Sequence, residues 1–187
     1  MKVILSGGGT GGHIYPALTI ADQIKKLCPD ADISFVGTQQ GLEKDIIPRY
    51  GYPLKFIEVA GFRRSLSLDT LRSAAKLVAG LYDAYRIIKN ERPDLVIGTG
   101  GYVCGPIVFM AALHGIPCCI QEQNAMPGVT NKILSRYVRK VFLGYKEAGK
   151  YFHGKAELEY TGNPIRTEIL EHTREEALKE LGLDAAK

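Results

Sequence analysis

The chain has 187 residues, a length that suffices for one globular domain. Hydrophobic residues make up 45% of it and charged residues 24%, which is typical of a folded soluble protein and argues against a disordered one. The formal net charge of +4 permits an anionic partner, but Lys and Arg form no stripe interleaved with aromatic residues, so we expect no nucleic-acid partner.

Strands and helices alternate from the first residues. The apolar, β-branched run 2–6 predicts a buried strand that ends at a group of glycines. After the glycines, Pro16 suits the first turn of a helix, and apolar residues at helical spacing extend this helix to Leu27. The next predicted elements are a strand over 31–37, a short helix over 42–50, a strand over 53–59 and a long helix over 68–91.

The second half of the chain continues this alternation. It predicts strands over 94–98, 116–121 and 140–144, and helices over 107–114 and 129–137, before a charged amphipathic helix at the end. Near-continuous apolar strands separated by helices favour a parallel sheet that is covered on both faces. The sequence therefore predicts an α/β fold with a Rossmann-like, doubly wound parallel sheet.

Three unusual loops follow predicted strands. They are GGGTGGH (7–13), GTGGYVCGP (98–106) and QEQNAMPG (121–128). In an open parallel sheet, ligands bind outside the carboxyl ends of the strands, where the strand order reverses. We therefore expect the three loops to line one crevice.

The first loop contains five glycines between a strand and a helix. Glycines let backbone N–H groups approach an anion, and the helix N-terminus adds a favourable dipole, so we expect a phosphate near Gly8 to Gly12. A tight turn without a ligand is the alternative. The segment 36–41 has no Asp or Glu for a ribose, and GKS and GKT are absent, so neither a dinucleotide fingerprint nor a P-loop is predicted.

His13 stands where this helix opens. The positive end of the helix dipole favours a neutral imidazole, and a neutral imidazole beside a bound phosphate can accept a proton from a hydroxyl group. A structural histidine that bonds a neighbouring loop fits the sequence equally well.

The other two loops carry aromatic and polar side chains. Gly100 and Gly101 precede Tyr102 and indicate a backbone surface that a bulky ligand approaches. The run 122–124 places Glu, Gln and Asn at a strand end, where such side chains either bind ligands or tie loops together. From the residues alone, Asn131 on the next helix is expected to be solvated.

The four cysteines form no CxxC pair. Cys118 and Cys119 are adjacent on a predicted strand and point to opposite faces, which argues against a shared metal ion. We expect all four cysteines, which also include Cys28 and Cys104, to be free thiols in a reducing compartment. We also expect that no metal is required.

Four motifs together resemble one family. GGGTGGHIYPALTIA, GTGGYVCGP, HGIPCCIQEQNAMPGVTNK and TGNPIR occur in this order and closely resemble the MurG family. Its members are inverting glycosyltransferases of the GT-B fold that transfer N-acetylglucosamine from UDP-N-acetylglucosamine (UDP-GlcNAc) to undecaprenyl-pyrophosphoryl-MurNAc-pentapeptide, converting lipid I to lipid II in peptidoglycan synthesis. The resemblance implies this reaction, no cofactor, and a peripheral location on the cytoplasmic face of the bacterial plasma membrane.

The resemblance covers the N-terminal half of the family's proteins. It implies an acceptor-side, membrane-associated domain over 1–163, and an interdomain linker with the start of a donor-binding domain over 164–187. Because the second domain makes most contacts to the UDP-sugar in this family, we expect the chain to be inactive alone. Two alternatives are a non-catalytic membrane-docking subunit of a split two-chain glycosyltransferase, and an NAD-dependent oxidoreductase, which the absent ribose acid disfavours.

The resemblance also implies roles for individual residues. His13 is expected to be the base that activates the acceptor hydroxyl, with Glu122 as a second catalytic residue. The expected substrate-binding residues are Thr10, Gly11, Gly12, Tyr102, Asn124, Asn131 and Arg166. A metal site is not expected.

The long predicted helix carries two apolar stripes. Leu71, Ala75, Val78 and Tyr82 form one stripe and Leu77 and Leu81 the other, with Arg63, Arg64, Arg72 and Lys76 close by. One stripe must face the core, and the other, framed by cations, fits an anionic membrane surface. A single wide core face with solvated charges is the alternative.

Overall fold

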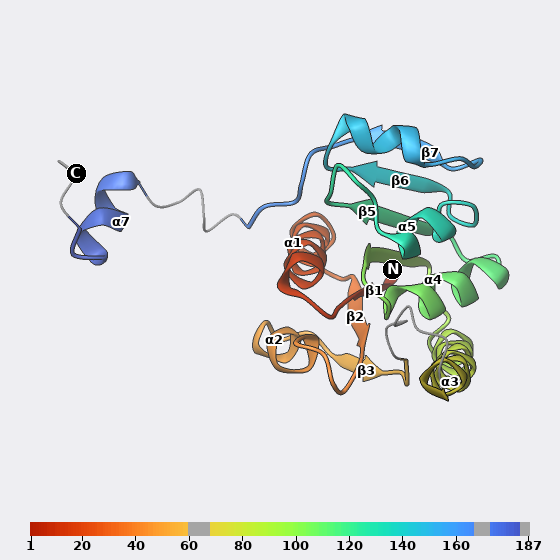
Figure 1. The fold of residues 1–187 in the computed structure, drawn as a ribbon. Helices are drawn as coiled ribbons and strands as arrows, with labels where there is room; N and C mark the ends of the chain where they lie inside the picture. Colours follow the sequence, from red (N-terminus) through yellow and green to blue (C-terminus); the bar gives the residue numbers. More distant parts are fainter. Residues whose placement is uncertain (60–67, 167–172, 184–187) are drawn as a thin grey trace.

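The computed structural model describes residues 1–59, 68–166 and 173–183, and the side chains of 68–75 lie outside this description. Strands and helices alternate along the chain (Figure 1). The strands are β1 (Lys2–Gly7), β2 (Asp32–Gly37), β3 (Leu54–Phe56), β4 (Leu95–Gly100), β5 (Cys118–Glu122), β6 (Lys140–Leu143) and β7 (Glu157–Tyr160). The helices are α1 (Gly11–Leu27), α2 (Glu43–Arg49), α3 (Leu68–Glu91), α4 (Cys104–Leu113), α5 (Val129–Leu134) and α7 (Arg174–Glu180), with a 3-10 helix η1 at Lys146–Tyr151.

The strands form one sheet in the order β3-β2-β1-β4-β5-β6-β7, and every pairing is parallel. The chain moves outward from β1 to β3, returns to place β4 beside β1, and then moves outward the other way to β7. The reversal between β1 and β4 is the topological switch point of a doubly wound sheet. The predicted fold class is therefore confirmed.

The core has one apolar layer on each face of the sheet. Alternate residues of a strand point to opposite faces. In β1, Val3 and Leu5 pack with Ile14 of α1, whereas Ile4 packs in the layer that contains Ala84 of α3 and Ile107 of α4. Because both faces of the strand are covered, the central strands read as near-continuous apolar runs.

Helix α1 begins earlier than Pro16 indicates. Its first residue is Gly11, and its first turn includes His13, whose N–H donates to the carbonyl of Thr10 at 3.1 Å. Pro16 lies inside the helix and lacks the N–H that would bond the Gly12 carbonyl. The expectation that Pro16 occupies the first turn was wrong, because the glycines that precede it are themselves helical.

Strand β7 and helix η1 have no counterpart among the predicted elements. All four residues of β7 are exposed, so the strand has no apolar pattern. It pairs with β6 at the edge of the sheet, where Nζ of Lys140 lies 3.3 Å from Oε1 of Glu157 and 2.7 Å from Oε2 of Glu159. Charged edge strands of this kind discourage further strand pairing.

The predicted terminal helix is present as α7. Its N-cap, Thr173, forms a capping box with Glu176, and none of its residues is buried. Figure 1 shows α7 apart from the sheet. Its local hydrogen bonds therefore account for the helix without tertiary packing.

Helix α3 packs on the sheet through one face. Ala84 and Ile88 are buried, and a Cβ at Gly80 would lie 2.6 Å from the carbonyl of Glu58. Val78 and Tyr82 are exposed, so the described part of their stripe is not the core face. Of the other residues predicted for the membrane surface, Arg63 and Arg64 and the side chains of Leu71, Arg72 and Ala75 lie outside the described residues.

Within the described part of the chain, no helix has both the length and the apolar character needed to cross a membrane.

Candidate active site

The three loops meet at the switch point of the sheet. They follow β1, β4 and β5, which are neighbours in the sheet. His13, from the first loop, places its Nδ1 atom 3.0 Å from the carbonyl oxygen of Thr99 at the end of β4 and 3.2 Å from Oε1 of Gln123 after β5. One imidazole therefore joins all three loops, and the predicted convergence of the loops is confirmed.

The partners of Nδ1 determine where the His13 proton lies. Gln123 donates through Nε2 to the carbonyl of Thr99 at 2.7 Å and also to the backbone and side-chain oxygens of Gln121, so its Oε1 must face the imidazole. Nδ1 then faces two oxygen acceptors and must carry the proton. In the neutral ring, Nε2 keeps its lone pair, and no described residue bonds it.

The two interpretations of His13 concern different atoms of the same ring, and the geometry is compatible with both. Nδ1 ties the first loop to its neighbours, as a structural histidine does, while Nε2 remains available to accept a proton. The ring is further fixed because the hydroxyl of Thr99, which is fully buried, donates to the backbone carbonyl of His13 at 2.7 Å.

The first turn of α1 presents unused hydrogen-bond donors. Thr10 is the exposed N-cap in an extended conformation, and its side chain makes no capping bond. The described residues offer no acceptor to the amides of Gly11 and Gly12, and no acidic residue lies in the first turn. Free amides at the positive end of a helix are suited to bind an anion.

Several glycines here make room for the protein's own atoms. A Cβ at Gly7 would collide with the Thr99 hydroxyl, and one at Gly101, where φ is +80°, would collide with the carbonyl of Gly8. A Cβ at Gly100 would lie 2.8 Å from His13 Nδ1. Gly100 and Gly101 were expected to face a bulky ligand, but their free space is filled by the first loop instead.

Glu122 is a buried carboxylate that organises the third loop. It is 1% exposed and accepts four hydrogen bonds of 2.9–3.1 Å, from the amide and side chain of Asn124, the amide of Gly128 and the side chain of Asn131. Both carboxylate oxygens are thus occupied by donors of the same loop region. This geometry favours a positioning function over the catalytic one that the resemblance implies.

Asn124 and Asn131 lie on either side of this carboxylate. Asn124 is exposed and gives its Nδ2 to Glu122, which leaves Oδ1 as an acceptor. Asn131 is 2% exposed, so the expectation that it is solvated was wrong: its Nδ2 donates inward to Glu122 at 2.9 Å. Its Oδ1 is buried and has no partner among the described residues, a cost of about 1–3 kcal/mol.

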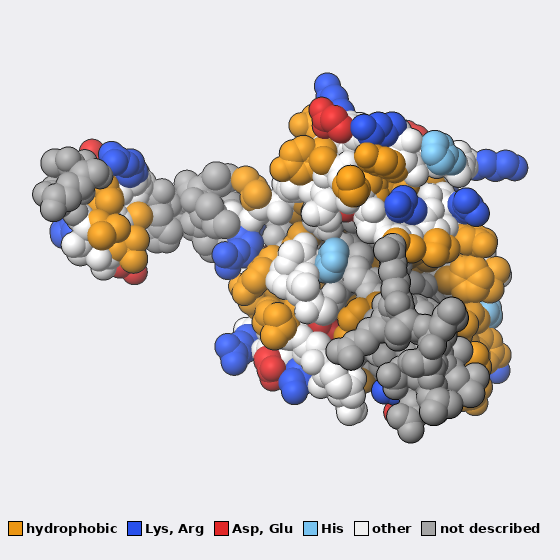
Figure 2. All heavy atoms as spheres, viewed as in Figure 1, with side chains coloured by type: hydrophobic (Ala, Val, Ile, Leu, Met, Phe, Trp, Pro, Cys, Tyr) orange, Lys and Arg blue, Asp and Glu red, His pale blue; other side chains and the backbone are white. Residues whose placement is uncertain are grey.

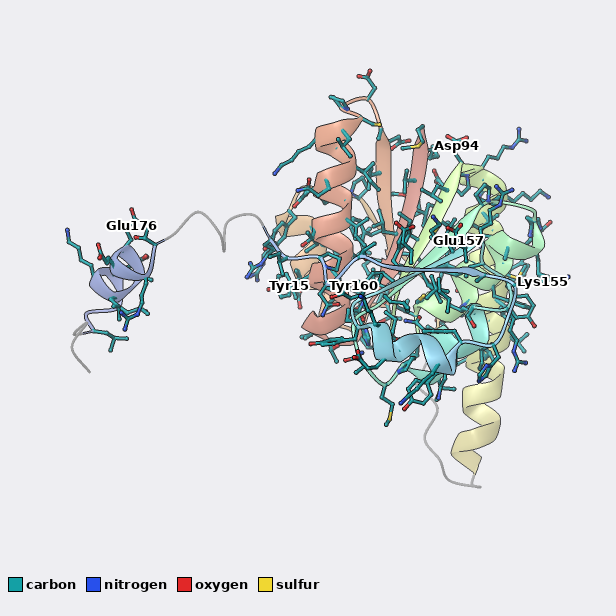
Figure 3. All side chains as sticks on the ribbon, turned by 90° about the horizontal axis from the view of Figure 1, so that it is seen from above. Tyr15, Asp94, Lys155, Glu157, Tyr160 and Glu176 are labelled. Atoms are coloured by element: carbon teal, nitrogen blue, oxygen red, sulfur yellow. The ribbon has the colours of Figure 1, made fainter. Side chains whose placement is uncertain are left out.

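Tyr102 and Arg166 also lie near the first loop. Tyr102 is half-buried, and a Cβ at Gly9 would lie 3.3 Å from its ring. The guanidinium of Arg166 lies 4.8 Å from the ring centre of Tyr15 on α1. Figure 3 shows Tyr15 and Tyr160 toward one side of the domain and Lys155, which precedes β7, on the far side.

The cysteine near the site is not a nucleophile. Cys104 begins α4 directly after the second glycine loop, and burial, together with the charge of Glu122, raises the pKa of its thiol to about 12. All four cysteines are free. Among the described residues, no three His, Cys, Asp or Glu side chains gather in a group that could hold a metal ion.

The sequence interpretation missed three contributors to this site. Thr99 and Gln123 orient His13, and Glu43 of α2 bonds the amide of Gly9. Gln123 was visible in the polar run at the end of β5. Glu43 is the first acidic residue after segment 36–41, in which we looked for an acid that could bind a ribose, so it could have been noticed there. Its carboxylate is fully buried in the structure.

The fold and the site define the class of protein. An α/β domain with free helix N-terminal amides and an oriented imidazole at its switch point is suited to act on a ligand that carries phosphate. Residues 3–143 match the N-terminal domain of glycosyltransferase family 28, and the chain belongs to this family.

Two relatives are similar over the whole chain. The UDP-N-acetylglucosamine–N-acetylmuramyl-(pentapeptide) pyrophosphoryl-undecaprenol N-acetylglucosamine transferase of Acetivibrio thermocellus is 56% identical over 183 residues, which are 98% of this chain and 50% of the relative. The protein of the same name from Clostridioides difficile is 50% identical over 189 residues, covering 100% of this chain and 46% of the relative. The chain thus spans about half the length of the curated relatives it matches.

Solved structures agree with this relationship. MurG of Acinetobacter baumannii is 31% identical and aligns with a TM-score of 0.73 over 92% of this chain and 49% of that one. The UDP-GlcNAc 2-epimerase of Neisseria meningitidis, bound to UDP-GlcNAc, has a TM-score of 0.66 over 97% of this chain and 54% of that one. At 12% identity, the epimerase shows only a shared fold.

Proposed function

We propose that this chain is the acceptor-side half of an inverting glycosyltransferase that transfers GlcNAc from UDP-GlcNAc to undecaprenyl-pyrophosphoryl-MurNAc-pentapeptide. The observation that carries the proposal is the His13 ring, whose Nδ1 is held by Thr99 and Gln123 while Nε2 is free where three loops meet. The substrates are taken from the relatives, which are named for this transfer and which the chain matches over about half their length.

The reaction is a single displacement. The 4-hydroxyl oxygen of MurNAc attacks the anomeric carbon of GlcNAc, and the bond from that carbon to the diphosphate breaks as UDP leaves with the electron pair. Because the new bond forms on the face opposite the leaving group, the configuration inverts. His13 Nε2 takes the hydroxyl proton, a contribution of about 10²–10⁴-fold to the rate.

The remaining residues bind and orient the substrates. The amides of Gly11 and Gly12 donate to diphosphate oxygens, and Arg166 supplies a positive charge at the same end of α1. Thr10 contributes its hydroxyl, which makes no capping bond to α1, and Asn124 presents Oδ1 to a hydroxyl or amide of a sugar.

Tyr102 and Asn131 act from behind the loops. Tyr102 supports the first loop at Gly9, and Asn131 holds Glu122, which in turn holds the Asn124 side chain. We assign Glu122 to the positioning of Asn124 within this scheme.

The domain boundary is proposed at residue 163. The side chain of Asn163 accepts from Gln121 at 3.3 Å and donates to the carbonyl of Gln123 at 3.2 Å, so the domain is tied together up to this residue. Residues 164–187 are assigned to an interdomain linker and the start of a donor-binding domain, which would make most contacts to UDP-GlcNAc. The unburied helix α7 fits this assignment.

The membrane surface is proposed on α3, α4 and α5, which cover one face of the sheet. Figure 2 shows hydrophobic side chains gathered toward the α4 and α5 side of the molecule with Lys and Arg beside them. Among the described side chains, the large apolar residues of these helices that are exposed are Val78 (67%), Tyr82 (62%), Val129 (61%), Leu113 (59%) and Ile133 (55%). Such a surface fits peripheral binding to anionic lipid on the cytoplasmic face of the plasma membrane.

Transfer by a complete enzyme tests the proposed reaction. We expect a fusion of residues 1–187 to the carboxyl-terminal half of the Acetivibrio thermocellus relative to transfer labelled GlcNAc from UDP-GlcNAc to a lipid I analogue. Chain 1–187 alone should give no transfer, and it should bind inorganic pyrophosphate with NMR shifts at the amides of Gly11 and Gly12. A folded fusion without transfer activity would contradict the proposal.

Vesicle flotation tests the membrane surface. We expect the wild-type chain to float with phosphatidylglycerol vesicles and not with phosphatidylcholine vesicles. The double variant Val78→Ser, Tyr82→Ser should lose this binding. The matched control is Leu27→Ser, Tyr50→Ser on the opposite face, which should retain it, and equal loss in both variants would argue against the assigned surface.

A further inference from the structure

Glu43, at the first position of α2, is a buried carboxylate that the proposed reaction does not use. Its side chain is 0% exposed, and none of the ion pairs among the described residues includes it. A buried carboxylate without a cation is costly unless N–H and O–H donors satisfy it. The donors that surround Glu43 therefore indicate what this side chain does.

The two carboxylate oxygens hold two different loops. Oε1 accepts from the amide of Thr38 at 2.9 Å and from its hydroxyl at 2.8 Å, in the loop that follows β2. Oε2 accepts from the amide of Gly9 at 3.0 Å, in the glycine loop that follows β1. Glu43 is thus a bridge between the glycine loop and the neighbouring loop of the sheet.

Three glycines make room for this bridge. A Cβ at Gly8 would lie 2.7 Å from the Glu43 carboxylate, and a Cβ at Gly37 or Gly41 would also collide with the side chain. These glycines belong to two loops that are far apart in the sequence. The loops are therefore shaped around Glu43, and part of the glycine content of the first loop is explained by this side chain.

The bridge also separates the amides of the glycine loop into two groups. Glu43 occupies the amide of Gly9 from inside the protein, whereas the amides of Gly11 and Gly12 have no acceptor among the described residues. A glycine loop without a tether would lose more conformational entropy when it closes on an anion. A tether at Gly9 reduces that cost before the ligand arrives.

We propose that Glu43 is a positioning residue that fixes the glycine loop in the shape that receives a diphosphate. This inference rests on the proposed function, because it assigns the ligand of the loop to the diphosphate of the substrates. The negative charge of Glu43 itself repels an anion. Glu43 therefore favours diphosphate binding only because it orders the glycine loop.

The variant Glu43→Gln separates the two halves of the bridge. Gln has one side-chain oxygen, and Thr38 offers two donors to it, so the oxygen remains on the Thr38 side. The Gln NH₂ group then faces the Gly9 amide, donor against donor, and only the link to the glycine loop is lost. Glu43→Asp keeps the charge but is one methylene too short to reach both loops, so it provides a second variant with the same expected defect.

Thr38→Val is the matched control. It removes the hydroxyl donor to Glu43 and the acceptor of the Gly41 amide, but it leaves the carboxylate and its bond to Gly9. A merely structural function of the bridge would make this control behave like the Glu43 variants. Each variant is examined as chain 1–187 by ¹⁵N NMR, with the exchange rate of the Gly9 amide and the Kd of inorganic pyrophosphate as readouts.

We expect Glu43→Gln and Glu43→Asp to speed Gly9 amide exchange and to weaken pyrophosphate binding, each about tenfold, as the loss of a hydrogen bond to a charged group implies. Thr38→Val should lower the Tm but change both readouts by less than about threefold. Equal changes in all variants, or wild-type values in the folded Glu43 variants, would overturn the inference. A wild-type chain that binds no pyrophosphate would count against the proposed function, while the Gly9 exchange rates would still decide whether Glu43 orders the loop.

Discussion

Replacing His13 by Ala in the fusion enzyme tests the proposed base most directly. Loss of a general base is expected to lower kcat by about 10²–10⁴-fold, which is about 2.7–5.4 kcal/mol in the barrier. The fold should change little, because the carbonyl of Thr99 keeps its bond from Gln123 at 2.7 Å. The Thr99 hydroxyl also keeps its acceptor, since this is the backbone carbonyl of residue 13. The stability cost is that of the lost side-chain hydrogen bonds, about 0.5–1.5 kcal/mol for each.

The assay compares two histidines that bond in a similar way. His114 at the end of α4 also has a contact from Nδ1 to a backbone carbonyl, that of Met110 at 2.8 Å, but it lies outside the loops of the site. A general base contributes to the rate only where it reaches the reacting hydroxyl, and His114 does not. His114→Ala should therefore leave kcat within about twofold of wild type. Initial rates of GlcNAc transfer at saturating substrates and urea unfolding are measured for both variants. A kcat for His13→Ala close to that of His114→Ala would refute the reasoning.

Three further predictions concern the surroundings of the site. Thr99→Val removes the hydroxyl bond to the backbone of His13, the proposed base, and should lower kcat about tenfold with an unchanged KM in steady-state kinetics, whereas a change in KM alone would contradict this. Gly8→Ala places a Cβ 2.7 Å from the Glu43 carboxylate and should cost about 1–3 kcal/mol in urea unfolding, and an unchanged midpoint would show that the loop adapts. Burial raises the pKa of Cys104 and of Cys118 to about 12, so each thiol keeps its proton in the folded state above pH 9 while the unfolded chain loses it. Stability should therefore fall by up to about 1.4 kcal/mol per pH unit for each thiol between pH 9 and 11, and the Cys104→Ala, Cys118→Ala variant should show a smaller slope if this cause is correct.

The order of the central elements is predictable because their burial leaves a clear pattern. β1, β2, β4 and β5 lie between two helical layers, and their apolar runs are visible without any structural information. β7 is not predictable in this way, because an edge strand with four exposed residues has no apolar periodicity. The start of α1 was misplaced for another reason: glycine is a poor helix former, so its presence in the first turn of a helix is decided by tertiary contacts.

The meeting of the three loops is predictable from topology, but the contacts within it are not. Parallel strands that are neighbours in the sheet bring their carboxyl ends together, which is sufficient to expect His13 near the loop after β5. The side chain that meets His13 there is Gln123, 110 residues away, and no local pattern specifies such a pair. Burial is likewise a tertiary property: Asn131, which was expected to be solvated, is buried, and so is Glu122, which accepts a hydrogen bond from the Asn131 side chain.

Two buried carboxylates beneath a proposed anion site require an explanation, because their charge opposes the ligand. Glu43 and Glu122 are each satisfied by N–H and O–H donors of the loops, three for the first and four for the second. Donors that point inward are thereby occupied by the protein, and those of Gly11 and Gly12 remain for a ligand. The hydrogen bonds disperse the charge of each carboxylate, and the free amides themselves form the positive end of α1, with the guanidinium of Arg166 beside Tyr15 on the same helix. A diphosphate that approaches would therefore meet donors that are already in place. The glycine content of the loops thus provides close contact with these internal anions as well as access for the ligand.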